Sequence, residues 1–211
     1  MSCQQRDSNQ KGNNQYSNLF SISTPKNEFS ISTFDEQGEE ISKVEGVKAN
    51  GFNNVVLLNT TYWSYCKGID ARDKVVGIVD KDRIMKEDSS HLMKVKSVGK
   101  GGVLDLEQIL FLKPDLIICN SFQKNELKGI KNCPVLVVNE FWENDPLGKL
   151  EWIKVFGVLT GKYEEAEKYF DKVSNQYTSL LNSFKKGNPS ELTVKSKSVL
   201  SLNKFGSNYF V

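Results

Sequence analysis

The chain contains a single histidine, His91, and none of the short motifs that mark common catalytic or nucleotide-binding sites. No G-x-S-x-G, P-loop or G-x-G-x-x-G pattern occurs along its 211 residues. His91 lies in a charged segment without partners at metal-ligand or catalytic-triad spacing. We therefore expect no catalytic residues and no metal site. His91 is interpreted as a solvated loop residue, with a haem ligand as the alternative.

Long apolar runs and clusters of basic charge are also missing. No stretch approaches the roughly 20 apolar residues that a membrane-spanning helix needs, so we expect a soluble or merely anchored protein. The 28 basic and 26 acidic residues are scattered along the chain, which argues against nucleic acid as a partner. A hydrophobic fraction of 38% is nevertheless enough for a packed core.

Cysteine is scarce, with four residues in all. Cys119 ends one predicted strand and Cys133 precedes the next, so a parallel sheet would hold them at opposite ends, and Cys66 falls inside a predicted helix. We interpret these three as small buried hydrophobic residues rather than disulfide partners.

The fourth cysteine lies in a polar amino-terminal segment. Cys3 follows Ser2 and precedes a run of polar residues, and a bacterial lipoprotein has this arrangement once its apolar signal peptide has been removed. We expect residues 1–27 to be a polar tether with Cys3 as the site of lipid attachment. The alternative is an incidental cysteine in a frayed terminus.

The pattern of the middle of the chain predicts an α/β fold with a mostly parallel sheet. Alternation over residues 28–46 indicates a hairpin. A helix that is capped by Thr60 or Thr61 and ends at Gly68 follows the first buried strand. Residues 81–94 look charged and irregular. The predicted strands cover residues 54–59, 75–78, 95–98, 116–119 and 135–138.

The segment 104–121 (LDLEQILFLKPDLIICNS) describes a short helix followed at once by a buried strand. Asp105 and Gln108 form a variant of the capping box, and Leu106, Ile109 and Leu110 share one helix face. Pro114 forces the helix to end. Asn120 and Ser121 then lie at the carboxyl end of the strand, where open α/β sheets bind ligands.

The last third is helical. Asp145 and Pro146 are good first-turn residues for a helix that runs to Gly161, and a second helix keeps its spacing from Tyr163 to about Lys186. Residues 199–202 would then form a strand.

Aromatic residues supply the candidate ligand site, because several follow buried strands and therefore lie at one edge of the sheet. Rings at such positions can stack on planar or bulky ligands, although ordinary packing is the alternative for each. Lys100, in a Gly-rich turn, could hold an anion. The candidate ligand-binding residues are Tyr62, Trp63, Lys100, Phe122, Phe141 and Trp142.

Four segments in the right order resemble class III substrate-binding proteins of ABC importers. Residues 104–121 resemble the family's signature, 67–78 (KGIDARDKVVGI) and Val98-Gly99 precede it, and 146–153 (PLGKLEWI) resemble a helix of its lipoprotein members. The resemblance implies two lobes, joined by a spine helix, that capture an iron–siderophore, haem or cobalamin for an inner-membrane permease.

The resemblance also implies a division of the chain. Residues 28–145 correspond to an amino-terminal α/β lobe and 146–187 to the helical segment with the spine helix. Residues 188–211 correspond to the start of a second lobe that is largely absent. Glu107 matches the acidic residue that docks on a permease arginine. The implied protein is a periplasmic, membrane-anchored lipoprotein without a cofactor of its own.

Two other hypotheses stay open. One is a non-transporting remnant that lacks most of the second lobe. The other is an enzyme on a related doubly wound fold, such as an oxidoreductase, which would need a cofactor motif or a set of cysteine ligands.

Overall fold

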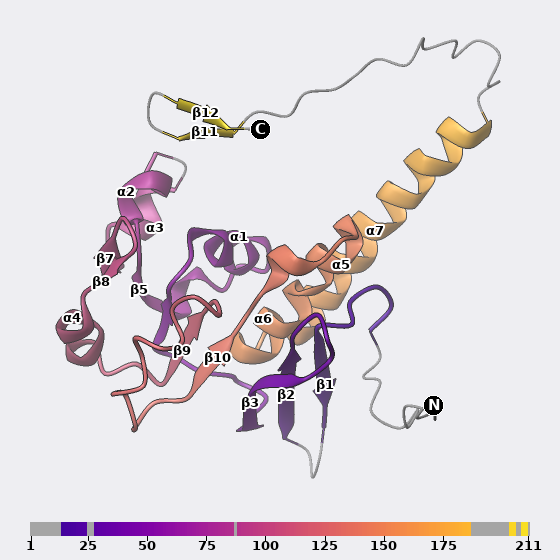
Figure 1. Ribbon diagram of the computed structural model, residues 1–211. Helices are drawn as coiled ribbons and strands as arrows, with labels where there is room; N and C mark the ends of the chain where they lie inside the picture. The colour runs from indigo at the N-terminus through magenta and orange to yellow at the C-terminus, as the bar shows by residue number, and fades with distance from the viewer. Residues whose placement is uncertain (1–13, 25–27, 87, 187–202, 206–207, 211) are drawn as a thin grey trace, which may run out of the picture. The chain divides into compact units, whose positions relative to one another are not determined.

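The computed structural model describes residues 14–24, 28–86, 88–186, 203–205 and 208–210 (Figure 1). The chain divides into two compact units, Met1–Val173 and Ser174–Val211. The second unit contains the far end of helix α7 (Tyr163–Lys186) and the hairpin of β11 (Asn203–Phe205) and β12 (Asn208–Phe210). The candidate site lies in the first unit, which is described below.

A five-stranded parallel sheet forms the centre of the first unit. Its spatial order is β10-β9-β4-β5-β6, so the chain lays down β5 and β6 on one side of β4 and then β9 and β10 on the other. The parallel α/β prediction is confirmed. The strands are β4 (Val55–Leu57), β5 (Val75–Ile78), β6 (Lys96–Ser97), β9 (Leu116–Cys119) and β10 (Val135–Val137).

Both faces of the sheet are covered, which explains why its central strands are continuously apolar. Leu116 and Ile118 contribute to the core beneath helices α1 (Thr60–Gly68) and α6 (Ile153–Thr160). Ile117 and Cys119 contribute to a second core on the opposite face, beneath helix α4 (Leu106–Phe111) (Figure 1).

A three-stranded antiparallel sheet flanks the parallel one. The predicted hairpin is confirmed as β2 (Phe29–Phe34) and β3 (Glu40–Val47). Strand β1 (Phe20–Ser23) pairs with β2, so the tether predicted for residues 1–27 extends too far into the chain. The backbone N–H of Val137 in β10 donates to the Ser42 hydroxyl in β3 at 2.9 Å, and this contact covers the edge of the parallel sheet.

Helix starts and stops follow side-chain chemistry, with one correction. Asn59, rather than Thr60 or Thr61, caps α1, because its extended backbone lets its side chain accept the N–H of Thr61 at 2.9 Å. Asp105 caps α4 as predicted and accepts the N–H of Gln108 at 2.9 Å. Pro114 follows Lys113, whose positive φ of 48° is incompatible with a continuing helix.

The face predicted for α4 is only partly buried. Ile109 is fully buried, whereas Leu106 and Leu110 are 38% and 56% exposed. A helix of six residues makes fewer than two turns, so a single position can face the sheet.

The charged stretch predicted to be irregular contains two short helices, α2 (Lys81–Ile84) and α3 (Ser89–Leu92). Each has four residues, too few to show a helical period in the sequence. The hairpin of β7 (Gly99–Lys100) and β8 (Val103–Leu104) was not predicted either.

The predicted helix up to Gly161 is divided at Trp152 into α5 (Pro146–Glu151) and α6, although the backbone at Trp152 stays helical. Gly161 ends α6 in the left-handed conformation, as predicted. Helix α7 is confirmed over its predicted length.

The N-terminal clamp consists of two buried carboxylates, Glu143 and Glu151. Glu151 accepts the backbone N–H groups of residues 15, 16 and 17 at 2.8–2.9 Å and pairs with the Lys154 ammonium at 3.1 Å. Glu143 accepts the Ser17 hydroxyl and the Trp152 indole N–H. Two acids therefore fix the segment that leads into β1.

Three cysteines are free, as predicted. Cys66 and Cys119 are buried, and burial raises the pKa of each thiol to about 12, whereas Cys133 is half-buried. Cys3 and the strand predicted at 199–202 lie outside the described residues. Within the described part of the chain, no helix is both long and apolar enough to cross a bilayer.

Candidate ligand-binding edge

A small cavity lies where the strand order reverses, between the chain segments that follow β4 and β9. Open α/β sheets bind ligands at this position, because loops on either side of the reversal part and leave a crevice. The segment that follows β5 contributes a third wall. The cavity has a volume of about 190 Å³ and is lined by Leu58, Asn59, Thr60, Val79, Asp80, Arg83, Lys100, Gly102, Val103, Leu104, Asn120 and Gln123.

Polar side chains hold the loops on the two sides of this crevice. Asn120 accepts the backbone N–H groups of Phe122 and Gln123 at 3.0 and 3.3 Å. Gln123 Nε2 donates to the carbonyl of Leu58, after β4, at 2.7 Å. The prediction that the residues after β9 lie at the carboxyl edge is therefore confirmed.

Two cations line the cavity at the β5 side. Arg83 approaches Asp80 at 3.4 Å, and the Lys100 ammonium lies 2.9 Å from Asp82. Hydrogen bonding to Lys100 holds the pKa of Asp82 below its ordinary value. The Lys100–Asp82 pair is exposed on both sides, and the Arg83 guanidinium is exposed although Asp80 is mostly buried, so both cations can turn toward an anion. Arg83 was missed by the sequence analysis, since its charged segment shows no period.

An aromatic surface, made of Phe122, Phe141 and Trp142, lies at the carboxyl ends of β9 and β10. The rings of Phe122 and Phe141 stack with centroids 5.8 Å apart, and Trp142 meets Phe141 edge-on at 5.5 Å. Phe122 is 75% exposed and Phe141 39% exposed. The structure thus brings three of the predicted ligand-site aromatics together, with open ring area on Phe122 and Phe141, whereas Trp142 is half-buried and packs against the core.

Tyr62 and Trp63 lie elsewhere, in the core beneath α1. The Tyr62 hydroxyl donates to the carbonyl of Val138 at 2.6 Å, and its ring packs against Phe156. Their predicted position on an accessible edge is therefore corrected: both belong to the face of α1 that packs on the sheet. Trp152 and Phe156 are also buried.

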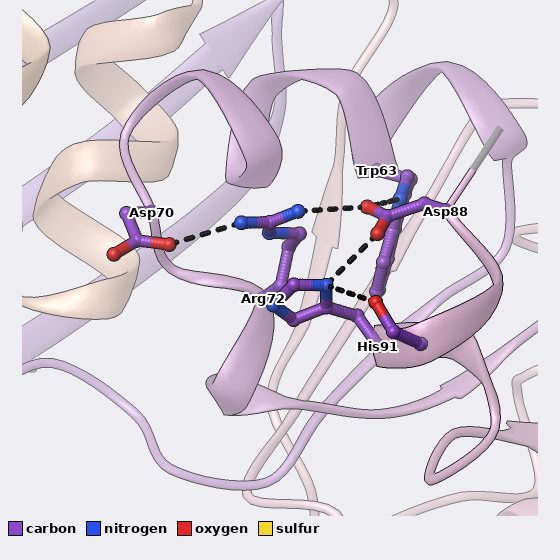
Figure 2. A network of polar contacts seen from close by, with 6 residues as sticks. Trp63, Asp70, Arg72, Asp88 and His91 are labelled. Carbon is purple, nitrogen blue, oxygen red and sulfur yellow. Dashed lines mark hydrogen bonds and ion pairs between the residues drawn. The ribbon is translucent and has the colours of Figure 1, made fainter.

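A polar network joins Trp63 to α3 (Figure 2). The buried carboxylate of Asp88 accepts from Trp63 Nε1 at 3.2 Å, from Arg72 at 2.9 Å and from His91 Nδ1 at 2.9 Å. Burial by itself raises the pKa of Asp88, but hydrogen bonds from Arg72 and His91 outweigh it and hold the pKa below its usual range. His91 is therefore exposed to solvent, as predicted, but it lies in helix α3 rather than in a loop and bonds to Asp88.

Two buried polar side chains lie at the base of the aromatic surface. Asn139 follows β10, and Glu140 opens the 3₁₀ turn η3 (Glu140–Trp142) that carries Phe141 and Trp142. Asn139 Oδ1 accepts the Ser121 N–H at 3.0 Å, but Asn139 Nδ2 and Glu140 Oε2 have no hydrogen-bond partner among the described residues. Neither residue was predicted from the sequence, although a polar pair after a buried strand is a usable signal.

Glu107 lies apart from the aromatic surface, in the first turn of α4. It is exposed and lines an open groove of about 780 Å³ with Ser97, Gly99, Lys100, Val103, Leu104, Asp105 and Leu106. Lys100 therefore borders both hollows. Among the described residues, no three His, Cys, Asp or Glu side chains gather as a metal site would require.

The doubly wound sheet has a crevice at its carboxyl edge, the position at which α/β lobes of this kind bind ligands. Residues 55–201 match the family model of the periplasmic binding proteins, and the chain belongs to this family. The match confirms the family and fold that the sequence motifs predicted.

Similar proteins extend the finding. An uncharacterised lipoprotein of Methanocaldococcus jannaschii is 26% identical over 145 residues, which cover 62% of this chain and 35% of that protein. A solute-binding protein of Veillonella parvula superposes with a TM-score of 0.58 at 19% identity, over 83% of this chain and 50% of that one. The molybdate-binding protein of Haemophilus influenzae gives a TM-score of 0.56 at 16% identity, over 80% and 55%.

The solved structures lie below 25% identity and therefore show the fold alone. The chain spans about a third of the length of the curated relatives that it matches and about half the length of these solved structures.

Proposed function

We propose that this chain supplies the ligand-capturing lobe of an ABC-importer component that delivers an iron–siderophore, haem or cobalamin to a membrane permease. One observation carries the proposal: an exposed aromatic surface and a cation-lined cavity occupy the same carboxyl edge of the sheet. The side chains of Phe122, Phe141, Arg83 and Lys100 are exposed, so they are available to a ligand.

The chemistry of this edge favours an anionic chelate with aromatic groups. Arg83 and Lys100 can exchange their carboxylate partners for a ligand anion, and the rings of Phe122, Phe141 and Trp142 can stack on planar groups. A ferric catecholate uses both features. Among the structural neighbours, one is bound to a complex of two acinetobactin molecules with ferric iron, and another belongs to an Fe³⁺-hydroxamate transport system.

The partner side of the proposal rests on two further residues. Glu107 is exposed on α4 and would dock on a permease arginine, and Cys3 would hold the protein to the membrane through a lipid. The family and the lipoprotein relative support a periplasmic, membrane-anchored location. The protein's contribution is binding and delivery rather than bond making or breaking.

Tryptophan fluorescence tests the ligand class. The chain is titrated with a ferric catecholate, a ferric hydroxamate, molybdate, haemin and cobalamin. Trp142 lies on the aromatic surface, so a bound chelate should quench it, and Trp142→Phe should abolish most of the response. Trp63→Phe is the matched control, because Trp63 is buried beside Asp88.

Charge removal tests the cavity. Arg83→Ala together with Lys100→Ala should weaken ferric catecholate binding at least tenfold, while the exposed Lys128→Ala, outside the cavity lining, should not. Loss of binding in the Lys128 variant alone, or no saturable response to any of the five probes, would refute the proposed ligand class.

A further inference from the structure

Glu140 stands out because it is a buried acid with one oxygen that has no donor among the described residues. The residue is only 5% exposed, and its Oε2 is fully enclosed with no hydrogen-bond partner among the described residues. Its neighbour Asn139, only 1% exposed, also keeps an unpaired Nδ2. Folded proteins rarely leave such atoms unpaired, because each pays its desolvation cost with no compensating bond.

The groups around Glu140 compensate its charge only in part, because a hydrogen bond from its own backbone N–H lowers the pKa less than burial raises it. Lys149, from α5, is the cation that acts on it, but no ion pair joins the two side chains in the described structure. The charge of Glu140 raises the pKa of Tyr62 and of Tyr65, both from α1. Neither hydroxyl donates to Glu140, because they donate to the carbonyls of Val138 and Lys149. Glu143, three residues later, is itself an acid, with its own donors Ser17 and Trp152.

The position of Glu140 connects this acid to the ligand edge. It opens η3, the turn whose next two residues are Phe141 and Trp142, and Phe141 stacks on Phe122. Glu140 is already buried, so a ligand on these rings would act on it through charge. An anionic ligand adds like-charge repulsion, which disfavours the ionised form of a nearby acid.

We propose that Glu140 couples ligand capture at the aromatic surface to the uptake of one proton. The inference rests on the proposed function, and it makes Glu140 a positioning residue beneath the site. The protonated, neutral side chain accompanies the occupied surface, and the ionised side chain accompanies the empty one. The affinity for an anionic chelate therefore falls as pH rises through neutrality.

The pKa of Glu140 is consistent with proton uptake near neutral pH. Burial raises the pKa of Glu140 to about 7, so the carboxyl changes its protonation within the range of ordinary environments. If the ligand binds only the protonated form, affinity should weaken about tenfold between pH 6 and pH 8. An exposed glutamate, with an ordinary pKa near 4.3, would give no such change over this interval.

The first experiment needs no ligand. Carboxyl ¹³C NMR of glutamate-labelled protein should show one resonance with a midpoint near pH 7 that disappears in Glu140→Gln. Glu143→Gln is the matched control, since Glu143 is an equally buried acid that has donors, and it should leave this resonance in place. Retention of the resonance in Glu140→Gln, or a midpoint below about 5.5, would overturn the proposal.

The second experiment measures the coupling. Calorimetric titration with a ferric catecholate, in two buffers of different ionisation enthalpy at pH 7.5, should reveal net proton uptake by the wild-type chain. The weakening between pH 6 and pH 8 should vanish in Glu140→Gln and persist in Glu143→Gln. Affinity that is independent of pH, or that tightens as pH rises, would overturn the coupling. If no probe binds at either pH, the proposed function fails, and the NMR midpoint still decides whether Glu140 titrates near neutrality.

Discussion

The N-terminal clamp and the base of the aromatic surface both bury a glutamate, Glu151 and Glu140 respectively, but they supply it with different numbers of hydrogen-bond donors. Glu151 is fully buried and accepts three backbone N–H groups and the Lys154 ammonium. Glu140 is nearly as buried, yet one of its oxygens has no donor among the described residues. The first region uses charge to hold the chain together, whereas the second tolerates an energetic cost beside the candidate site.

The contrast shows that burial alone does not reveal what an acid contributes. A carboxylate surrounded by donors stabilises the ionised form and the fold together. A buried carboxylate with few donors favours the neutral form and makes the fold sensitive to pH. The balance of donors against burial therefore predicts the direction of a mutation's effect, since burial raises the pKa of Glu143 in spite of its two side-chain donors.

Removing the acceptor of the clamp should have the largest effect. Glu151→Ala leaves three backbone N–H groups and the Lys154 ammonium without their acceptor. We expect a loss of about 3–5 kcal/mol in the free energy of unfolding, measured by urea denaturation. Glu164→Ala, an exposed acid on α7, is the control and should change stability by less than about 0.5 kcal/mol. Equal effects of the two substitutions would contradict the clamp.

Neutralising Glu140 should act in the opposite direction and only at higher pH. Its folded pKa of about 7 lies above the ordinary value of 4.5, so the folded state holds a proton that the unfolded state has released. Wild-type stability therefore falls as pH rises from 4.5 to 7, by up to about 3 kcal/mol. Relative to wild type, Glu140→Gln should gain this amount between pH 4 and pH 8 in urea denaturation. A constant difference across this range would contradict the burial of an uncompensated acid.

An exposed acid with one backbone donor should give an intermediate effect. Asp105→Ala removes the cap that accepts the Gln108 N–H, and we expect α4 to lose about 1 kcal/mol of stability. Hydrogen exchange of the α4 amides measures this change. Asp105→Asn, which keeps an oxygen acceptor, should restore most of the protection.

Substitution of an exposed acid without a structural role should have the smallest effect on stability. Its effect should appear in permease-dependent uptake instead. Glu107→Arg should leave the unfolding free energy within about 0.5 kcal/mol of wild type, because Glu107 is exposed. Affinity for a ferric catecholate should also stay unchanged, while permease-dependent uptake should fall further than in Glu107→Ala, because reversal opposes like charges. Equal uptake by wild type and Glu107→Arg would remove the docking role.

The sequence predicted those elements whose signal is local. The predicted bounds of β5 and β9 match those in the structure, because parallel strands that are covered on both faces appear in the sequence as apolar runs. Helix α7 was located because 24 residues show many turns of one period. Asp105 was identifiable because a cap depends only on its nearest neighbours.

Features made by the tertiary structure could not be predicted. The Asp88 network joins residues from α1, η2 (Arg72–Lys74) and α3, which the sequence does not place together. Tyr62 and Trp63 follow a strand just as Phe141 and Trp142 do, and only the packing of α1 against α6 distinguishes buried rings from accessible ones. The raised pKa of Glu140 arises from the elements that enclose it, so its residue type alone gave no indication.

The clamp also sets a length scale for the protein at a membrane. Residues 15–17 are held by Glu151, and twelve residue steps separate Gln15 from Cys3 (15 − 3). Even a fully extended chain of that length reaches only about 40 Å. If Cys3 carries a lipid, the start of the lobe would stay within that distance of the membrane surface rather than diffuse freely through the surrounding solution. The clamp, by fixing where the leash begins, would thereby determine the local concentration at which the lobe meets a permease in the same membrane.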